Sequence, residues 1–164
     1  YQEFAQSRKD LEKMLGGRII YNDVSKNWEF KKANQKFTMG TTAEGIKKVA
    51  ILDTLLGNRY LDTDSVIFID EPESALHPKA ISDLLDIIAL LAQRGMQFFL
   101  SSHSYFVVKK LFLVAQSKEM SIPVISITDG LQYNSSNLKD EWPDNPIIDE
   151  SIRLYKEEVK LALK

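Results

Sequence analysis

Two adjacent carboxylates follow one of the most apolar short runs in the chain. Residues 66–69 are Val, Ile, Phe and Ile, and Asp70 and Glu71 come directly after them. A carboxylate at the end of a buried strand can hold Mg²⁺ beside the phosphates of a nucleotide. A neighbouring glutamate can orient or deprotonate the water that attacks the terminal phosphate. The pair therefore indicates metal-assisted phosphate chemistry, while the bland alternative is that it solvates a turn after a strand.

An imidazole follows the second apolar run. The stretch "FFLSSHS", residues 98–104, brings His103 just past a strand-like segment. A histidine there can donate to a terminal phosphate and stabilise the charge on its oxygens. Because the carboxyl ends of parallel strands lie along one edge of a sheet, we expect Asp70, Glu71 and His103 to share that edge.

The central section alternates strand and helix signals, which must position these side chains. Apolar runs predict strands at 66–69, 96–104 and 122–128, and helical spacing predicts helices at 78–94 and 105–116. Near-continuous apolar strands joined by amphipathic helices are typical of a parallel sheet covered on both faces. The sequence therefore predicts an α/β fold.

The N-terminal flank predicts a helix end followed by a small antiparallel sheet. Residues 1–15 have helical character and stop at Gly16-Gly17, and β-like runs cover 18–21, 28–31 and 36–39. A further amphipathic helix is expected from residue 43 to residue 56.

The C-terminal flank predicts a polar loop and a last helix. Residues 129–146 are rich in Asn, Ser and Asp and contain two prolines. An apolar stripe then follows at helical spacing, and we expect it to pack against the sheet: Ile148, Ile152, Tyr155, Val159 and Leu163.

Composition excludes several classes of site. The 164 residues carry a net charge of -2 and no cysteine, so disulfides and thiolate metal sites are excluded. No apolar run approaches the roughly 20 residues that span a bilayer, so we expect a cytoplasmic protein without a membrane partner.

The string "IFIDEPESALHP", residues 67–78, resembles the Walker B and D-loop segment of ABC-type ATPases. The likeness is greatest to their soluble branch of structural-maintenance-of-chromosomes (SMC), RecF-like and overcoming-lysogenization-defect (OLD) proteins. "FFLSSHS" resembles the switch-histidine strand of this family, and "TTAEGIKKVAIL", residues 41–52, lies where the family has its signature motif. The resemblance covers about residues 40–128 and implies the C-terminal half of a P-loop NTPase-like ABC head.

This resemblance implies an ATP hydrolase with ATP and Mg²⁺ as cofactors. Asp70 would hold the Mg²⁺, Glu71 would polarise the hydrolytic water, and His103 would contact the γ-phosphate. In a head-to-tail homodimer, other residues would reach the nucleotide of the partner subunit. They are the D-loop residues Ser74, Ala75, Leu76 and His77, and the signature residues Thr42 and Gly45, where backbone N–H groups at a helix start favour anions.

Two features depart from the family pattern. Position 43 is alanine where the signature serine usually stands, and the phosphate-binding pattern G-x-x-x-x-G-K-[ST] does not occur in the sequence. With a first residue of Tyr1, we interpret residues 1–164 as a single domain, the C-terminal lobe of a longer chain whose N-terminal lobe with Walker A is missing. The fragment alone is expected to be inactive.

Other interpretations remain open. One is a non-hydrolysing dimerisation or regulatory module of the same fold, favoured by Ala43. Another is a metal-dependent nuclease in which Asp70, Glu71 and Glu73 ligate the ion with help from Asp129. A nucleic-acid partner or an effector domain is implied by the resemblance alone. Lys47 and Lys48 are interpreted as a solvated helix face.

Overall fold

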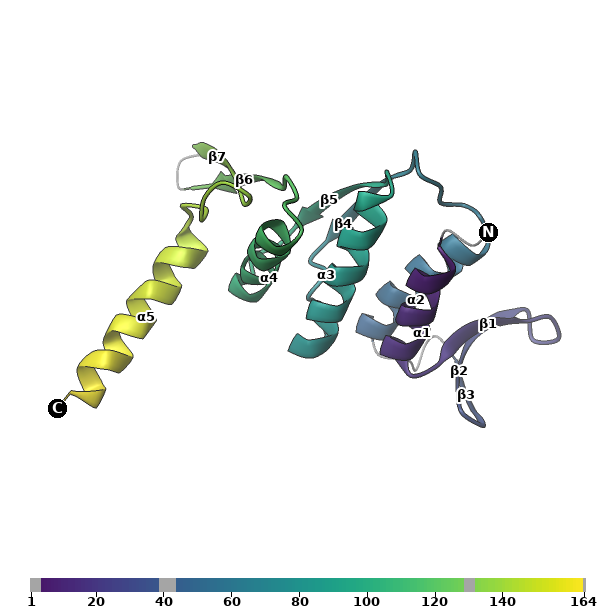
Figure 1. Cartoon of the computed structure of the whole chain (residues 1–164). Coiled ribbons are helices and arrows are strands. Elements are labelled where there is room, and N and C mark those ends of the chain that lie inside the picture. Colours follow the sequence, from purple (N-terminus) through teal and green to yellow (C-terminus); the bar gives the residue numbers. More distant parts are fainter. Residues whose placement is uncertain (1–3, 39–43, 129–131, 164) are drawn as a thin grey trace. The chain divides into compact units, whose positions relative to one another are not determined.

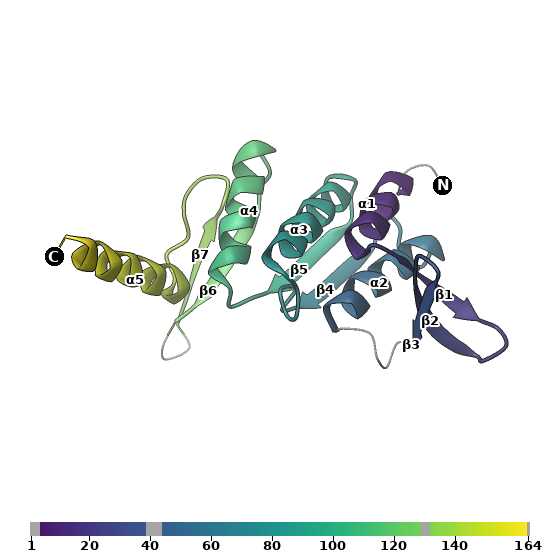
Figure 2. The same cartoon turned by 90° about the horizontal axis from the view of Figure 1, so that it is seen from below.

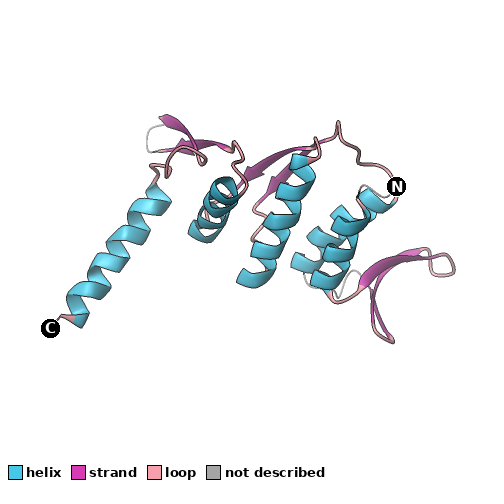
Figure 3. Cartoon of the chain, viewed as in Figure 1, coloured by secondary structure: helices cyan, strands magenta, loops and turns pink. Residues whose placement is uncertain are grey.

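The computed structural model describes residues 4–38, 44–128 and 132–163. The chain divides into two units, Tyr1–Ser102 and His103–Lys164. Unit 1 carries the acidic pair Asp70-Glu71, and unit 2 begins with His103. Figure 1 labels the elements along the chain, and Figure 3 colours them by type. The α/β fold class that the sequence predicts is confirmed, with small sheets and flanking helices.

The N-terminal part of unit 1 contains the predicted helix and antiparallel sheet. Helix α1 (Ala5–Leu15) ends at Gly16, whose φ of 64° is the left-handed conformation that glycine adopts at helix ends. Strands β1 (Arg18–Asn22), β2 (Asn27–Lys32) and β3 (Gln35–Thr38) pair in the order β1-β2-β3. Trp28 of β2 contacts Tyr21 of β1 edge-on, with ring centroids 5.2 Å apart.

Three helices build the core of unit 1. Helices α2 (Glu44–Gly57) and α3 (Pro78–Gln93) both contact α1. An ion pair of 3.0 Å between Arg8 and the buried carboxylate of Asp53 also joins α1 to α2. The buried apolar side chains of this core include Leu11, Leu15, Val49, Ala50, Leu52, Leu56, Leu84, Leu85, Ile88 and Leu91.

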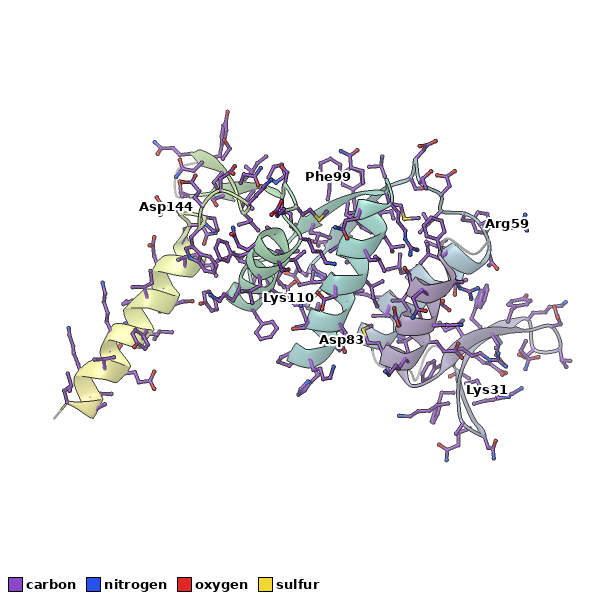
Figure 4. The ribbon with its side chains drawn as sticks, in the orientation of Figure 1. Lys31, Arg59, Asp83, Phe99, Lys110 and Asp144 are labelled. Atoms are coloured by element: carbon purple, nitrogen blue, oxygen red, sulfur yellow. The ribbon has the colours of Figure 1, made fainter. Side chains whose placement is uncertain are left out.

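Strands β4 (Val66–Asp70) and β5 (Gln97–Ser101) pair in parallel, as the sequence predicts. Figure 2 shows α3 in front of this pair, and Figure 4 shows Phe99 projecting from β5 on the side away from α3. On that side Phe68 is 75% exposed, and its ring stacks on Phe99 at 4.8 Å. Within unit 1, therefore, the described elements cover one face of this strand pair and leave the other face open. An unbroken apolar run signals burial on both faces, but among the described elements of unit 1 a helix covers one face.

Unit 2 contains α4 (Tyr105–Ser117), β6 (Pro123–Ile127), β7 (Tyr133–Asn137) and α5 (Pro146–Ala162). The predicted strand β6 is present, but it pairs antiparallel with β7. Within unit 1 the described parallel pair is β4 and β5, and the expected parallel pairing of β6 with this sheet stays a prediction. The segment expected to be loop contains β7, because ladder pairing forms a strand from the polar sequence "YNSSN", which has little intrinsic strand preference.

Helix α5 begins at Pro146, the last residue of the predicted loop, and within unit 2 most of its apolar stripe is exposed. The Asn145 side chain caps it by accepting from the Ile148 N–H at 3.0 Å. Ile148 is the buried residue of the helix, whereas Ile152 and Tyr155 are 45% and 65% exposed. The expected packing of the stripe against the sheet stays a prediction.

An aromatic cluster lies beside α4 in unit 2. Trp142 contacts Phe112 edge-on, with centroids 4.5 Å apart, and the Lys109 ammonium lies 4.7 Å from the Trp142 ring. In the described part of the chain, no helix combines the length and apolar character needed to cross a membrane.

Candidate functional site

The carboxylate of Asp70 lies at the exposed carboxyl end of β4. Strand alternation places Asp70 on the same face as Phe68, and the parallel register pairs it with Ser101 of β5. The Ser101 hydroxyl donates a hydrogen bond to the Asp70 carboxylate. The acid is thus held by a neutral donor, and part of its oxygen surface faces solvent.

The next residue, Glu71, turns the chain sharply away from the sheet. Its φ is 46°, a left-handed conformation that side chains other than glycine rarely adopt. The Glu71 N–H donates to the Ser101 carbonyl at 2.9 Å, and the Glu71 carbonyl accepts from the Ser74 N–H at 3.0 Å. Ala75, with a φ of 60°, ends the same turn. Two unusual backbone conformations therefore bracket the loop after the acidic pair.

Lys48 of α2 reaches the backbone of the acidic pair. Its Nζ lies 2.8 Å from the Glu71 carbonyl oxygen and 3.2 Å from that of Asp70. The side chain expected to be a solvated lysine is thus partly buried and bonded to two carbonyl groups. That part of the sequence interpretation is wrong for Lys48.

Gly45, in the first turn of α2, packs against the predicted D-loop of its own chain. A Cβ added to Gly45 would lie 2.6 Å from the Ala75 carbonyl oxygen and 2.6 Å from a methyl group of Leu76. The helix start and the loop approach so closely that glycine is required for steric reasons. The structure therefore brings Gly45, Ala75 and Leu76 together.

Glu73 and Ser102 connect the acidic loop to the end of β5. The Ser102 hydroxyl donates to Oε1 of Glu73 at 2.7 Å. The other carboxylate oxygen of Glu73 is buried and has no hydrogen-bond partner among the described atoms. Burying an oxygen of this kind without a hydrogen-bond donor is costly.

His77 caps the helix that follows the loop. Its Nδ1 accepts from the Lys79 N–H at 3.2 Å, and Pro78 occupies the first turn of α3. The residue chosen from the sequence as part of a D-loop thus also fixes where α3 begins.

The other predicted site residues lie in unit 2 or outside the described residues. His103 is exposed and is the first residue of unit 2, so its expected sharing of an edge with Asp70 and Glu71 stays a prediction. Thr42, Ala43 and Asp129 fall outside the described residues.

The end of β4 offers one carboxylate, that of Asp70, which fits Mg²⁺ better than a metal whose ligands all come from protein side chains. Within residues 4–38, 44–128 and 132–163, no group of three or more His, Cys, Asp or Glu side chains could hold a metal ion. The described residues thus lend no support to a nuclease site of Asp70, Glu71 and Glu73. Mg²⁺ commonly binds one or two carboxylates and completes its shell with water and phosphate oxygens, and Asp70 could supply such a carboxylate.

A family model described as "AAA domain, putative AbiEii toxin, Type IV TA system" matches residues 2–109 of the chain. The chain belongs to this AAA domain family. The matched residues of the AAA domain include Gly45, the acidic pair, the loop to His77 and His103. In a further comparison, 42 residues of the chain are 43% identical to the Old nuclease of Escherichia phage P2. That match covers 26% of this chain and 7% of the length of the nuclease.

Solved SMC head structures share the fold of this AAA domain at low sequence identity. An SMC ATPase studied for its ATP-driven dimerization aligns with a TM-score of 0.51 and 12% identity, covering 94% of both chains. An Smc head bound to the C-terminal winged-helix domain of ScpA aligns with a TM-score of 0.60 and 16% identity, covering 85% of this chain and 44% of that one. An Smc head with an extended coiled coil, in a complex derived from Pyrococcus furiosus, aligns with a TM-score of 0.55 and 14% identity. The alignment covers 94% of this chain and 38% of that one.

Proposed function

We propose that the chain is the C-terminal lobe of a Mg²⁺-dependent ATPase that hydrolyses ATP between two head-to-tail subunits. One observation carries the proposal. Asp70 and Glu71 leave the end of a parallel strand as a fixed pair, with Ser101 on the carboxylate of Asp70 and Lys48 on both backbone carbonyls. Membership of an AAA domain family supports nucleotide binding by this edge.

Each acid takes a separate part of the chemistry. Asp70 would hold Mg²⁺, which would supply positive charge beside the phosphate oxygens. Glu71 accepts a hydrogen bond from the attacking water and orients it toward the terminal phosphate. His103 donates to the γ-phosphate and stabilises the charge that develops on its oxygens.

A second lobe supplies the phosphate loop. The sequence has no G-x-x-x-x-G-K-[ST] pattern, and an aromatic face lies open on β4 and β5, with Phe68 and Phe99 at 75% and 47% exposure. We assign this face to an N-terminal lobe carrying Walker A, in keeping with two Smc heads of which the chain covers 44% and 38%. On this proposal the 164-residue chain alone binds ATP poorly.

The homodimer forms through the signature region and the D-loop. Gly45 in the first turn of α2 and the loop Ser74–His77 face the nucleotide of the partner subunit. Thr42, which lies outside the described residues, is assigned to the same contact by the family resemblance. The close packing of Gly45 on Ala75 supports a single surface made of both segments. The likeness to an SMC ATPase that dimerizes with ATP supports the same arrangement.

The test is Glu71→Gln in the natural protein that contains this chain. We expect turnover to fall by a factor of about 100 to 10,000, the range for loss of a general base, while ATP binding is retained. Glu12→Gln, on the exposed side of α1, is the matched control and should leave turnover unchanged. Turnover within a few fold of wild type in Glu71→Gln would exclude Glu71 as the base.

A second candidate is a dimerisation or regulatory module that does not hydrolyse ATP. Ala43 in place of the signature serine favours it, because a hydroxyl contact to the partner's nucleotide is then absent. ATP-dependent dimerisation without phosphate release from wild-type protein would favour this module. A cytoplasmic location, and a nuclease or other effector domain elsewhere in a longer chain, are proposed by likeness to the Old nuclease and the SMC heads.

A further inference from the structure

We infer that Lys48 is a positioning residue that aims Glu71 and couples the start of α2 to the acidic pair. The inference deepens the proposed ATPase function and rests on it for the catalytic part. The contact itself stands on the geometry of Lys48 and two carbonyl oxygens.

The bonds from Lys48 are of a strong kind. An ammonium that donates to a carbonyl oxygen makes a charge-assisted hydrogen bond, and the distance of 2.8 Å to the Glu71 oxygen is typical of such a bond. The second bond, at 3.2 Å to the Asp70 oxygen, ties the preceding peptide to the same donor. A single side chain therefore binds the two consecutive peptide groups that flank Glu71.

The backbone at Glu71 needs such support. A left-handed φ of 46° in a residue with a side chain persists only where neighbouring groups hold it. Ser101 accepts from the Glu71 N–H at 2.9 Å, and the Ser74 N–H and Lys48 share the Glu71 carbonyl. Because the backbone conformation sets the direction of the Cα–Cβ bond, these hydrogen bonds fix the direction in which the Glu71 side chain leaves the chain.

The same lysine gives α2 control over that aim. Lys48 lies three residues after Gly45, which is one turn of a helix, and Gly45 touches the loop at Ala75. Helix α2 therefore contacts the acidic loop at two points, through Lys48 at Glu71 and through Gly45 at Ala75. A shift of the helix start on contact with a partner's nucleotide would move the Glu71 carbonyl through Lys48.

The experiment compares Lys48→Met, Lys48→Arg and Lys79→Met in the full-length natural protein. Lys79 is a suitable control because it is also hydrogen-bonded, at 2.8 Å to Asp83, but on the exposed surface of α3. Amide hydrogen exchange of residues 70–76 is measured without nucleotide, alongside kcat and KM for ATP. Unchanged exchange in α1 and α3 confirms that each variant is folded.

In Lys48→Met we expect about tenfold faster exchange of residues 70–76, as for loss of a charge-assisted bond. We also expect kcat to fall by about tenfold or more with KM within about threefold, because the aim of Glu71 matters more to the transition state than to ATP binding. Lys48→Arg, which keeps a cationic donor, should recover most of both losses, and Lys79→Met should cause neither.

The two failures are distinguishable. Unchanged exchange of residues 70–76 in Lys48→Met would overturn the inference whatever the kinetics show. Faster exchange with unchanged kcat would overturn the coupling to catalysis. If wild-type protein has no ATPase activity while exchange responds as expected, the proposed function fails and the positioning contact is supported.

Discussion

At Gly45 a hydrogen atom in place of a side chain allows α2 to touch the loop after the acidic pair. The carbonyl oxygen of Ala75 lies where a Cβ would stand, and backbone cannot move aside as the tip of a side chain can. The need for glycine at this position therefore comes from packing within one chain, before any contact with a partner subunit.

Gly45→Ala is expected to lower the free energy of unfolding by about 1–3 kcal/mol, the usual cost of overpacking. Gly57→Ala is the comparison on the same helix, because its Cβ would meet the end of the Arg8 side chain at 2.7 Å rather than backbone, although Arg8 is also ion-paired with Asp53. Urea unfolding followed by circular dichroism compares the two variants. Equal stability of Gly45→Ala and wild type would show that the loop at Ala75 and Leu76 can shift to make room for the methyl group.

At this scale the sequence predicts some contacts and misses others. The acidic pair stands out because two carboxylates follow an apolar run. Lys48 was missed because a lysine on a helix is usually solvated, although its place three residues after Gly45 puts it on the buried side with Val49 and Leu52. Ser101 could be found only with the strand register, since only that register sets it beside Asp70.

At the scale of helices and strands, the spacing of apolar residues predicts where each element lies in the sequence better than it predicts which of its side chains are buried. The bounds of α2, α3 and β4 lie within a residue or so of those expected from the spacing of apolar residues, whereas β5 ends at Ser101, before the predicted residue 104. The exposure of Phe68 could not be predicted from the sequence. An apolar run predicts that a strand is buried, but it does not show whether the element that covers the strand belongs to the same chain. Strand β7 was missed since its polar residues gain strand structure from pairing with β6.

Helix α5 offers a test of local electrostatics. Arg153 donates to Glu150 and Glu157 at 2.8 and 2.9 Å, and its hydrogen bond and charge lower the pKa of Glu150. A lowered carboxyl pKa favours the folded helix above the ordinary pKa of glutamate. The effect is lost as the pH falls through the lowered pKa.

Arg153→Gln is expected to raise the pKa of Glu150 toward its ordinary value. Lys160→Gln, in the last turn of the same helix, is the control and is expected to leave that pKa unchanged. The measurement is a titration of side-chain carboxyl carbons by nuclear magnetic resonance. A pKa of Glu150 that is the same in wild type and Arg153→Gln would mean that the pair does not persist in solution. Little change in stability is expected, because both side chains are exposed.

For the whole molecule, the open face of β4 and β5 decides how the chain behaves alone. Val66, Phe68 and Phe99 are 51%, 75% and 47% exposed on one face of a parallel strand pair. Contiguous apolar surface of this kind is typical of a buried interface and promotes association when it is left uncovered.

The 164-residue chain is therefore expected to self-associate at micromolar concentration, and Phe68→Ser is expected to reduce that association. Tyr60→Ser is the control, because Tyr60 is also 75% exposed but lies in the segment between α2 and β4. Sedimentation velocity measures both variants. A chain that stays monomeric at all concentrations would count against the face being an interface.

The tryptophans fall one to a unit, Trp28 beside Tyr21 in unit 1 and Trp142 beside Phe112 in unit 2. Each unit thus carries its own optical reporter, and the sequence contains 2 tryptophans in all. Fluorescence of Trp142→Phe would follow melting of the first unit, and that of Trp28→Phe melting of the second. The chain therefore supplies, without any added label, the means to learn whether its halves unfold together or in turn.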